Sequence, residues 1–168
     1  MQQVAIQDAN ILIDLVKTGL FAHCLALDYE FMTTDLVLDE LYTSQQAEIQ
    51  PHIDSGKFIV IQSSETELTN IRKLSLEDTH LSEQDWSTLY FAEQKKAILL
   101  SGDNQLRKVA ESRKLIVHGV LWILDSLFQF KLLTAQDCCR FLTSLVSQNR
   151  RLPWKECDER KKRWCLPE

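Results

Sequence analysis

Ala97-Ile98-Leu99-Leu100-Ser101-Gly102-Asp103, residues 97–103, is the stretch that decides the fold class. Its four consecutive apolar residues predict a buried strand, and the Ser-Gly-Asp turn closes that strand. Apolar residues then repeat at helical spacing from Leu106 to Ala110, so a helix follows the strand at once. A buried strand that leads directly into a helix is typical of the parallel sheets of α/β proteins.

The same alternation of strand and helix recurs along the chain. Further strand-like runs occupy residues 4–6, 31–34, 58–61 and 115–117. Helical spacing predicts helices that begin near residues 11, 35, 67 and 82, and an apolar helix over 121–130. The helix from Asp35 is expected to run to about Glu48, with Pro51 at or just past its end. Because parallel neighbours need crossover helices, the pattern predicts a Rossmann-like, three-layer α/β/α fold with a parallel sheet of about five strands.

The residues after 130 differ in pattern and charge. Thr134 and Asp137 have the spacing of a helix capping box, and Pro153 precedes a further expected helix over Trp154–Trp164. Residues 149–168 hold seven basic and four acidic side chains, so this segment carries +3 in a chain of 168 residues whose net charge is −5. We therefore divide the chain into a core domain, 1–130, and a helical C-terminal extension, 131–168, packed on or beside it.

The overall charge excludes one mode of binding. A chain with 19 Lys and Arg against 24 Asp and Glu does not hold nucleic acid or an acidic membrane by bulk positive charge. An anionic partner would therefore have to bind at a local site and not through the overall charge of the protein. The basic cluster near the C-terminus is either a solvated helix face or a contact with RNA phosphate, and its residues are Arg160, Lys161, Lys162 and Arg163.

The cysteines and the apolar runs bear on the location of the protein. The five cysteines form no CxxC pair, so we expect free thiols in a reducing, cytoplasmic compartment and neither a disulfide framework nor a zinc site. No apolar run approaches the ~20 residues that span a bilayer, which predicts no membrane segment. The sequence also lacks GxGxxG and GxxxxGK[ST], so dinucleotide-binding and P-loop functions are disfavoured.

Acidic residues gather where the functional crevice of a parallel sheet lies, beyond the carboxyl ends of the strands. Asp8 and Asp103 follow the first and fourth expected strands. Glu40 lies within two turns of the second strand, and Asp85 in the first turn of the helix before the fourth. Converging carboxylates repel one another unless a cation neutralises them, and Mg²⁺ or Mn²⁺ would do so while leaving room for a phosphate. The pattern indicates phosphodiester hydrolysis, although each acid alone is also explained as a helix cap or a solvated residue.

Four short motifs, taken in order, resemble those of a PIN domain: Asp8-Ala9-Asn10, Thr34-x-x-Val37-x-x-Glu40, Ser82-x-x-Asp85 and Leu100-Ser101-Gly102-Asp103. The match runs from about residue 4 to residue 128. It is most similar to VapC-like ribonuclease toxins and their uncharacterised bacterial relatives. The resemblance implies a PIN nuclease domain within residues 1–130, a Mg²⁺ or Mn²⁺ site and endonucleolytic cleavage of RNA.

The resemblance also implies roles for individual residues. The catalytic acids that bind the metal ion would be Asp8, Glu40, Asp85 and Asp103. Thr34 and Ser101 match small hydroxyl positions that orient a carboxylate or a metal-bound water, and Asn10 matches a frequent polar residue after the first acid. Many PIN domains carry another acid shortly after the last strand-end Asp. This chain has Asn104, a supporting residue at most, followed by Gln105, Leu106 and Arg107.

Two functions stay open at this point. The first is a metal-dependent endoribonuclease that acts as a toxin, restrained by an antitoxin protein in its cleft. The resemblance implies a homodimer for it, and the apolar helix over 121–130 could supply the dimer face. The second function rests on the missing acid: a catalytically weak or inactive PIN-like module that binds RNA or a protein.

Overall fold

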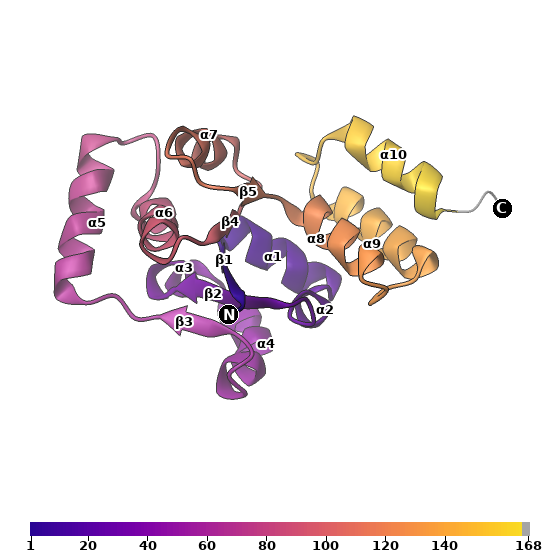
Figure 1. Cartoon of the computed structure of the whole chain (residues 1–168), viewed down its shortest axis with the longest axis horizontal. Helices are drawn as coiled ribbons and strands as arrows, with labels where there is room; N and C mark the ends of the chain where they lie inside the picture. Colours follow the sequence, from indigo (N-terminus) through magenta and orange to yellow (C-terminus); the bar gives the residue numbers. More distant parts are fainter. Residues whose placement is uncertain (166–168) are drawn as a thin grey trace.

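The computed structural model describes residues 1–165, and within them five parallel strands form one sheet (Figure 1). The strands are β1 (Gln3–Gln7), β2 (Tyr29–Thr34), β3 (Ile59–Ile61), β4 (Ile98–Leu100) and β5 (Val117–His118). Their order in the sheet is β3-β2-β1-β4-β5, and every neighbouring pair is parallel. The predicted parallel sheet of about five strands is therefore confirmed.

Helices on both faces of the sheet complete three layers (Figure 1). One side holds α1 (Ala9–Thr18), α2 (Phe21–Cys24), α4 (Thr43–Asp54), α8 (Val120–Gln129), α9 (Ala135–Gln148) and α10 (Trp154–Trp164). The other side holds α5 (Glu65–Glu77), α6 (Glu83–Lys95) and α7 (Asn104–Ser112). Ala5 of β1 packs in the first hydrophobic cluster and the next residue, Ile6, in the second, because successive side chains of a strand point to opposite faces. The predicted three-layer α/β/α fold is confirmed.

The helix expected from Asp35 to Glu48 is broken in two. Helix α3 (Asp35–Glu40) ends before Leu41, whose backbone is extended, and α4 begins at Thr43. Two side chains explain the break: Gln45 accepts the Tyr42 N–H at 3.0 Å, and the Gln46 amide donates to the Leu38 and Leu41 carbonyls at 2.8 and 3.1 Å. The expectation for Pro51 was also wrong, because Pro51 lies inside α4, which continues to Asp54.

The C-terminal helices extend the hydrophobic cluster that contains α1 and α8. The capping box predicted at the start of α9 is confirmed, since the Thr134 hydroxyl accepts the Asp137 N–H and the Asp137 carboxylate accepts the Thr134 N–H, each at 3.1 Å. Helix α10 has the predicted bounds. Leu142 and Leu145 of α9 and Trp164 of α10 are buried in the same cluster as α1 and α8. The extension thus shares its core with the first layer of helices.

Helix α8 turns its apolar face to its own chain. Five of its residues are at most 5% exposed, namely Val120, Leu121, Ile123, Leu124 and Leu127. The interpretation of this helix as a dimer face is therefore wrong for these side chains, and the homodimer itself stays a prediction. Among the helices of residues 1–165, none is both long enough and apolar enough to cross a membrane.

Two of the five cysteines form a disulfide, which corrects the expectation of free thiols throughout. Cys139 of α9 is bonded to Cys165, immediately after α10. Cys24, Cys138 and Cys157 are free and buried, as expected. The two bonded residues are 26 positions apart in the chain, so only the packing of α10 on α9 brings them together.

We expect Cys165→Ser to lower the free energy of unfolding of the oxidised protein by about 3 kcal/mol, because the disulfide closes a loop of 26 residues and restricts the unfolded chain. Urea unfolding with and without a thiol reductant measures this. The reductant should make wild type and variant equally stable. A difference that persists in reductant would contradict the disulfide as its cause.

Candidate active site

The first two acids of the site meet where the strand order reverses, between β1 and β4. Asp8 directly follows β1, and its N–H donates to the Leu100 carbonyl of β4 at 3.1 Å. The Ser101 hydroxyl donates to Asp8 Oδ2 at 2.5 Å and accepts the Asp103 N–H at 3.0 Å. Ser101 therefore links the two carboxylate-bearing residues across the crevice.

Asp8 and Asp103 also cap the helices that leave the crevice. Asp8 Oδ1 accepts the Ile11 N–H of α1, and Asp103 Oδ1 accepts the Leu106 N–H of α7, each at 2.9 Å. Each cap uses only one carboxylate oxygen. Within residues 1–165, the second oxygen of Asp103 has no hydrogen bond, so it is available to a ligand. Asp103 can therefore cap α7 with one carboxylate oxygen and bind a ligand with the other.

The other two acids are carried by α6 and α3. Asp85 forms the predicted capping box with Ser82 at the start of α6: its carboxylate accepts the Ser82 N–H at 3.1 Å, and its own N–H donates to the Ser82 hydroxyl at 3.0 Å. Glu40 is the last residue of α3 and is exposed. Because the chain turns away at Leu41, Glu40 lies at a helix end and not within a long helical face.

Thr34 positions these two helices. Its hydroxyl accepts the Val37 N–H of α3 at 3.2 Å and shares a 2.7 Å hydrogen bond with the Ser87 hydroxyl of α6. Both Thr34 and Ser87 are fully buried. The resemblance implied that Thr34 orients a carboxylate or a water, whereas here the hydroxyl joins the helix of Glu40 to the helix of Asp85. No motif in the sequence singles out Ser87, which lies one residue beyond Trp86 in α6.

The charges of neighbouring acids act on Asp8 and on Glu40. Burial raises the pKa of Asp8 to about 7; the hydrogen bonds from Ile11 and Ser101 oppose this rise, and the charges of Asp85 and Asp103 add to it. Partial burial, and then the charge of Asp85, raise the pKa of Glu40. The carboxyls of Asp8 and Glu40 are thus harder to ionise than usual, mainly because they are buried or partly buried and in addition because other acids are near.

The described residues supply no basic side chain that pairs with these four acids. Other acids of the molecule are paired, such as Glu93 with Arg113 at 2.9 Å. In the described part of the chain, by contrast, Asp8, Glu40, Asp85 and Asp103 take part in no ion pair. A buried carboxylate without a counter-charge is costly, and either a bound proton or a cation from outside the chain can neutralise it.

The oxygen atoms of these carboxylates are the type of ligand that suits a hard divalent cation. Carboxylate oxygens are the ligands that Mg²⁺ and Mn²⁺ prefer, and the protein need supply only one or two of them. In this structure, no three His, Cys, Asp or Glu side chains of residues 1–165 are close enough to hold a metal ion together. Asp8 and Asp103, joined through Ser101, are the pair best placed to contribute ligands.

The remaining predicted residues lie outside the carboxylate contacts. Asn10 and Asn104 are exposed in the first turns of α1 and α7, and within the described residues their side chains form no hydrogen bond to the acids. Arg160 donates to Asp125 at 3.0 and 2.5 Å and is largely covered. Lys162 pairs with Asp158 at 2.8 Å and Arg163 lies 3.9 Å from Asp125, whereas Lys161 has no ion pair within residues 1–165.

Arg107 is a basic group at the edge of the crevice. It lies one turn after Asp103 on α7, and its guanidinium donates to the Val117 carbonyl at 3.4 Å. A Cβ on Gly119 would lie 3.7 Å from this guanidinium and 3.8 Å from the Ser101 carbonyl. Burial, and then the charge of Arg107, lower the pKa of His118. The sequence offered only a weak signal for Arg107, its spacing of four residues from Asp103.

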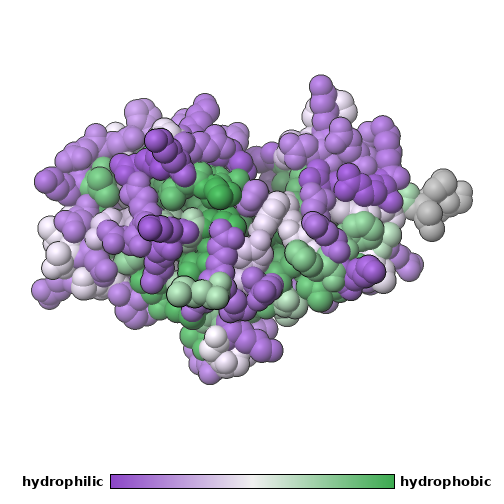
Figure 2. Space-filling model, viewed as in Figure 1, coloured by the Kyte–Doolittle hydropathy of each residue, from purple (hydrophilic) through white to green (hydrophobic). Residues whose placement is uncertain are grey.

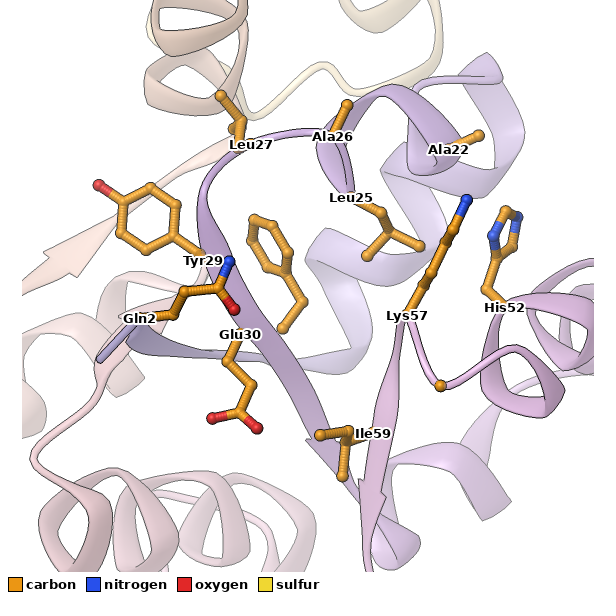
Figure 3. A pocket seen from close by; sticks show the side chains of 12 residues that line it. Gln2, Ala22, Leu25, Ala26, Leu27, Tyr29, Glu30, His52, Lys57 and Ile59 are labelled. Atoms are coloured by element: carbon orange, nitrogen blue, oxygen red, sulfur yellow. The ribbon is translucent and has the colours of Figure 1, made fainter.

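A separate pocket of about 380 Å³ lies at the opposite edge of the sheet (Figure 3). Its lining includes Tyr29 and Ile59, which begin β2 and β3, and Leu25, His52 and Lys57. The amino ends of parallel strands face away from the crevice at their carboxyl ends. None of the four acids lines this pocket, so it is distinct from the candidate active site.

Comparisons with known proteins identify the family and the fold. The family model described as DUF3368, PIN domain, matches residues 4–165. A solved structure, PAE2754 from Pyrobaculum aerophilum, is 17% identical, covers 75% of this chain and 98% of its own, and superimposes with a TM-score of 0.52, which shows a shared fold. A PilT N-terminus domain protein, SSO1118 from the archaeon Sulfolobus solfataricus P2, is 16% identical over 74% of this chain and 93% of its own, with a TM-score of 0.47. No curated protein matches the chain.

We expect the stability advantage of Asp8→Asn over wild type to grow by roughly 2–3 kcal/mol between about pH 5 and pH 8 in metal-free buffer. The fold raises the pKa of Asp8 from 3.8 to about 7, so the folded state favours the protonated carboxyl and loses stability as the pH rises through this window. Urea unfolding in EDTA measures the effect.

Asp137→Asn is the matched control for this experiment. Hydrogen bonds from Thr134 lower the pKa of Asp137 to about 2, so its contribution to stability is lost only in more acidic solution and should not change between pH 5 and pH 8. A pH-independent difference between Asp8→Asn and wild type would show that Asp8 is ionised in the fold at the lower pH.

Proposed function

Because the chain belongs to the PIN domain family, whose fold is a nuclease fold, we propose that it is a Mg²⁺- or Mn²⁺-dependent endoribonuclease that hydrolyses RNA phosphodiester bonds. One observation carries the proposal. Ser101 links Asp8 to Asp103 at the crevice of the sheet, and the charge of Asp85 acts on both Asp8 and Glu40. No basic side chain of the described residues pairs with any of these acids. A role as helix caps alone would not require one acid to lie in the field of another.

Each acid of the site has a role in the proposed hydrolysis. Asp8 and Asp103 would hold the metal ion, with Asp85 and Glu40 completing the acidic shell. When bound, the ion supplies a Lewis acid for the phosphate and a water molecule of lowered pKa. Ser101 fixes the orientation of Asp8. Glu40 is exposed and its pKa is raised, so it is suited to accept the proton of the attacking water.

The backbone assists binding of the phosphate. The N-termini of α1 and α7 both begin at the crevice, at Asp8 and Asp103. Helix N-termini carry partial positive charge and free N–H groups, which favour anions. The substrate phosphodiester would therefore meet a crevice whose acids are neutralised by the cation and whose helices attract the phosphate.

We expect Asp8→Asn and Asp103→Asn each to reduce Mn²⁺-dependent cleavage of a fluorescent RNA by roughly 100-fold or more, because each removes a charged ligand. Asp85→Asn should reduce cleavage as well. Asp137→Asn is its matched control, since Asp137 occupies the same capping-box position in α9 and should retain wild-type activity. Wild-type rates in Asp8→Asn and Asp103→Asn would show that the acids are not the site.

We propose that the cellular role is that of a toxin, in a complex with an antitoxin protein. Expression of the wild-type chain in a bacterial host should then arrest growth, whereas expression of Asp8→Asn to the same level should not. Equal growth of the two cultures would contradict the toxin role. The homodimer and the cytoplasmic location expected from the sequence are compatible with this role and stay predictions.

A catalytically weak or inactive module that binds RNA or protein is the second candidate. Asn104 stands where many relatives carry a further acid, and no three acids of residues 1–165 are close enough to hold a metal together. Calorimetric titration with Mn²⁺ separates the candidates. Heat of binding that Asp8→Asn abolishes supports the nuclease, and RNA that is bound but not cut, without any heat of Mn²⁺ binding, supports the module.

A further inference from the structure

A groove of about 400 Å³ separates the end of α9 from the start of α10. Val146 and Leu152 supply an apolar part of its lining. Asn149, Arg150, Trp154 and Lys161 also line it. The groove belongs to the C-terminal extension and contains none of the acids of the candidate active site.

Trp154 is an exposed aromatic side chain at the edge of this groove. It is 72% exposed, although the other tryptophan of α10, Trp164, is 1% exposed and packs in the core. Pro153 precedes Trp154, and the Lys155 amine lies 5.8 Å from the centre of its ring. Because α10 packs on α9 and is tied to it by the disulfide, the indole is presented on a fixed element. Such a side chain is a stacking platform for a nucleic-acid base.

The basic side chains of the groove are free to bind an anion. Within residues 1–165, Arg150 and Lys161 take part in no ion pair. The one acid of the lining, Asp158, is neutralised by Lys162 at 2.8 Å. Hydrophilic residues cover the visible surface of α10 in Figure 2. The groove therefore suits a ligand that carries both flat rings and negative charge.

The groove is close to the helix that carries Asp8. The Asn149 amide donates to the Asp14 carboxylate of α1 at 2.7 Å. Asp14 is six residues beyond Asp8, which corresponds to about 9 Å along a helix axis. A nucleic-acid strand that lies at the acids can therefore reach the groove within a few nucleotides.

We propose that the groove between α9 and α10 binds single-stranded RNA at a distance from the scissile bond, with a base stacked on Trp154 and flanking phosphates held by Arg150 and Lys161. The identity of the strand rests on the proposed nuclease function. The groove itself is supported by the exposed Trp154 indole, by two cations without an ion pair in residues 1–165, and by the contact with α1. It gives the C-terminal extension a role in holding the substrate.

Binding of a fluorescein-labelled, single-stranded RNA 12-mer to the full chain in EDTA tests the proposal without cleavage. We expect Trp154→Ala, and the double change Arg150→Glu with Lys161→Glu, each to weaken binding by about tenfold, as judged by fluorescence anisotropy. Trp154→Phe should retain most of the affinity because it keeps an aromatic face. Lys73→Glu, on exposed α5 at the opposite end of the molecule in Figure 1, is the control for charge reversal.

The outcomes separate the groove from the nuclease. Equal RNA affinity of Trp154→Ala and wild type would overturn the proposal, as would an equal loss in Lys73→Glu and the Arg150–Lys161 double variant. Hydrolysis of bis(p-nitrophenyl) phosphate by the wild type with Mn²⁺ reports on the acids alone. If RNA binding depends on Trp154 and no diester is hydrolysed, the proposed nuclease function is contradicted and the proposed RNA-binding groove is supported. Thermal melting of each variant shows whether it is folded.

Discussion

The hydrogen bond from the Ser101 hydroxyl to the Asp8 carboxylate is the interaction on which the candidate site depends. It joins the carboxyl ends of β1 and β4, strands that are neighbours in the sheet although 90 residues of chain separate Gln7 from Ile98. The same hydroxyl accepts the Asp103 N–H, so a single side chain sets the relation between the two acids. Because Asp8 is buried, the bond also satisfies an oxygen that water cannot reach.

The acids serve the fold and the site at once. Asp8, Asp85 and Asp103 each accept a backbone N–H at the start of a helix or just before it, which makes their positions rigid. Burial raises the pKa of Asp8, and the charges of Asp85 and Asp103 raise it further. Asp caps a helix as well as Ser or Asn does, so capping by itself accounts for an acid at each of these positions. The burial of Asp8, without an ion pair among residues 1–165, is the feature that capping does not require.

Local signals were sufficient to predict most of the fold, and tertiary contacts account for the rest. Buried strands and the Ser82 and Thr134 capping boxes depend on neighbours within a few residues, and they were predicted correctly. The break at Leu41 depends on the Gln46 side chain, which reaches back to the carbonyls of α3. The disulfide depends on the packing of α10 against α9. Neither is visible as a periodicity in the sequence.

For the site, the pairing of Asp8 with Asp103 across β1 and β4 could be predicted because the carboxyl ends of parallel strands share one edge, whereas the convergence of all four acids stays a prediction. The partners of individual side chains could not be predicted in the same way. Thr34 bonds to Ser87 and not to a carboxylate, and Arg160 is held by Asp125, 35 residues away. Such pairs depend on which helices pack against one another, and no short sequence pattern predicts those contacts.

The burial of α9 and α10 against α1 and α8 has a practical consequence for anyone who shortens this chain. A fragment that stops after α8 would leave the apolar faces of α1 and α8 in water, where Leu142, Leu145 and Trp164 now cover them. It would also lose the Asn149 amide that satisfies the half-buried Asp14 carboxylate. We expect such a fragment to aggregate, so mapping experiments on the extension require point variants and not deletions.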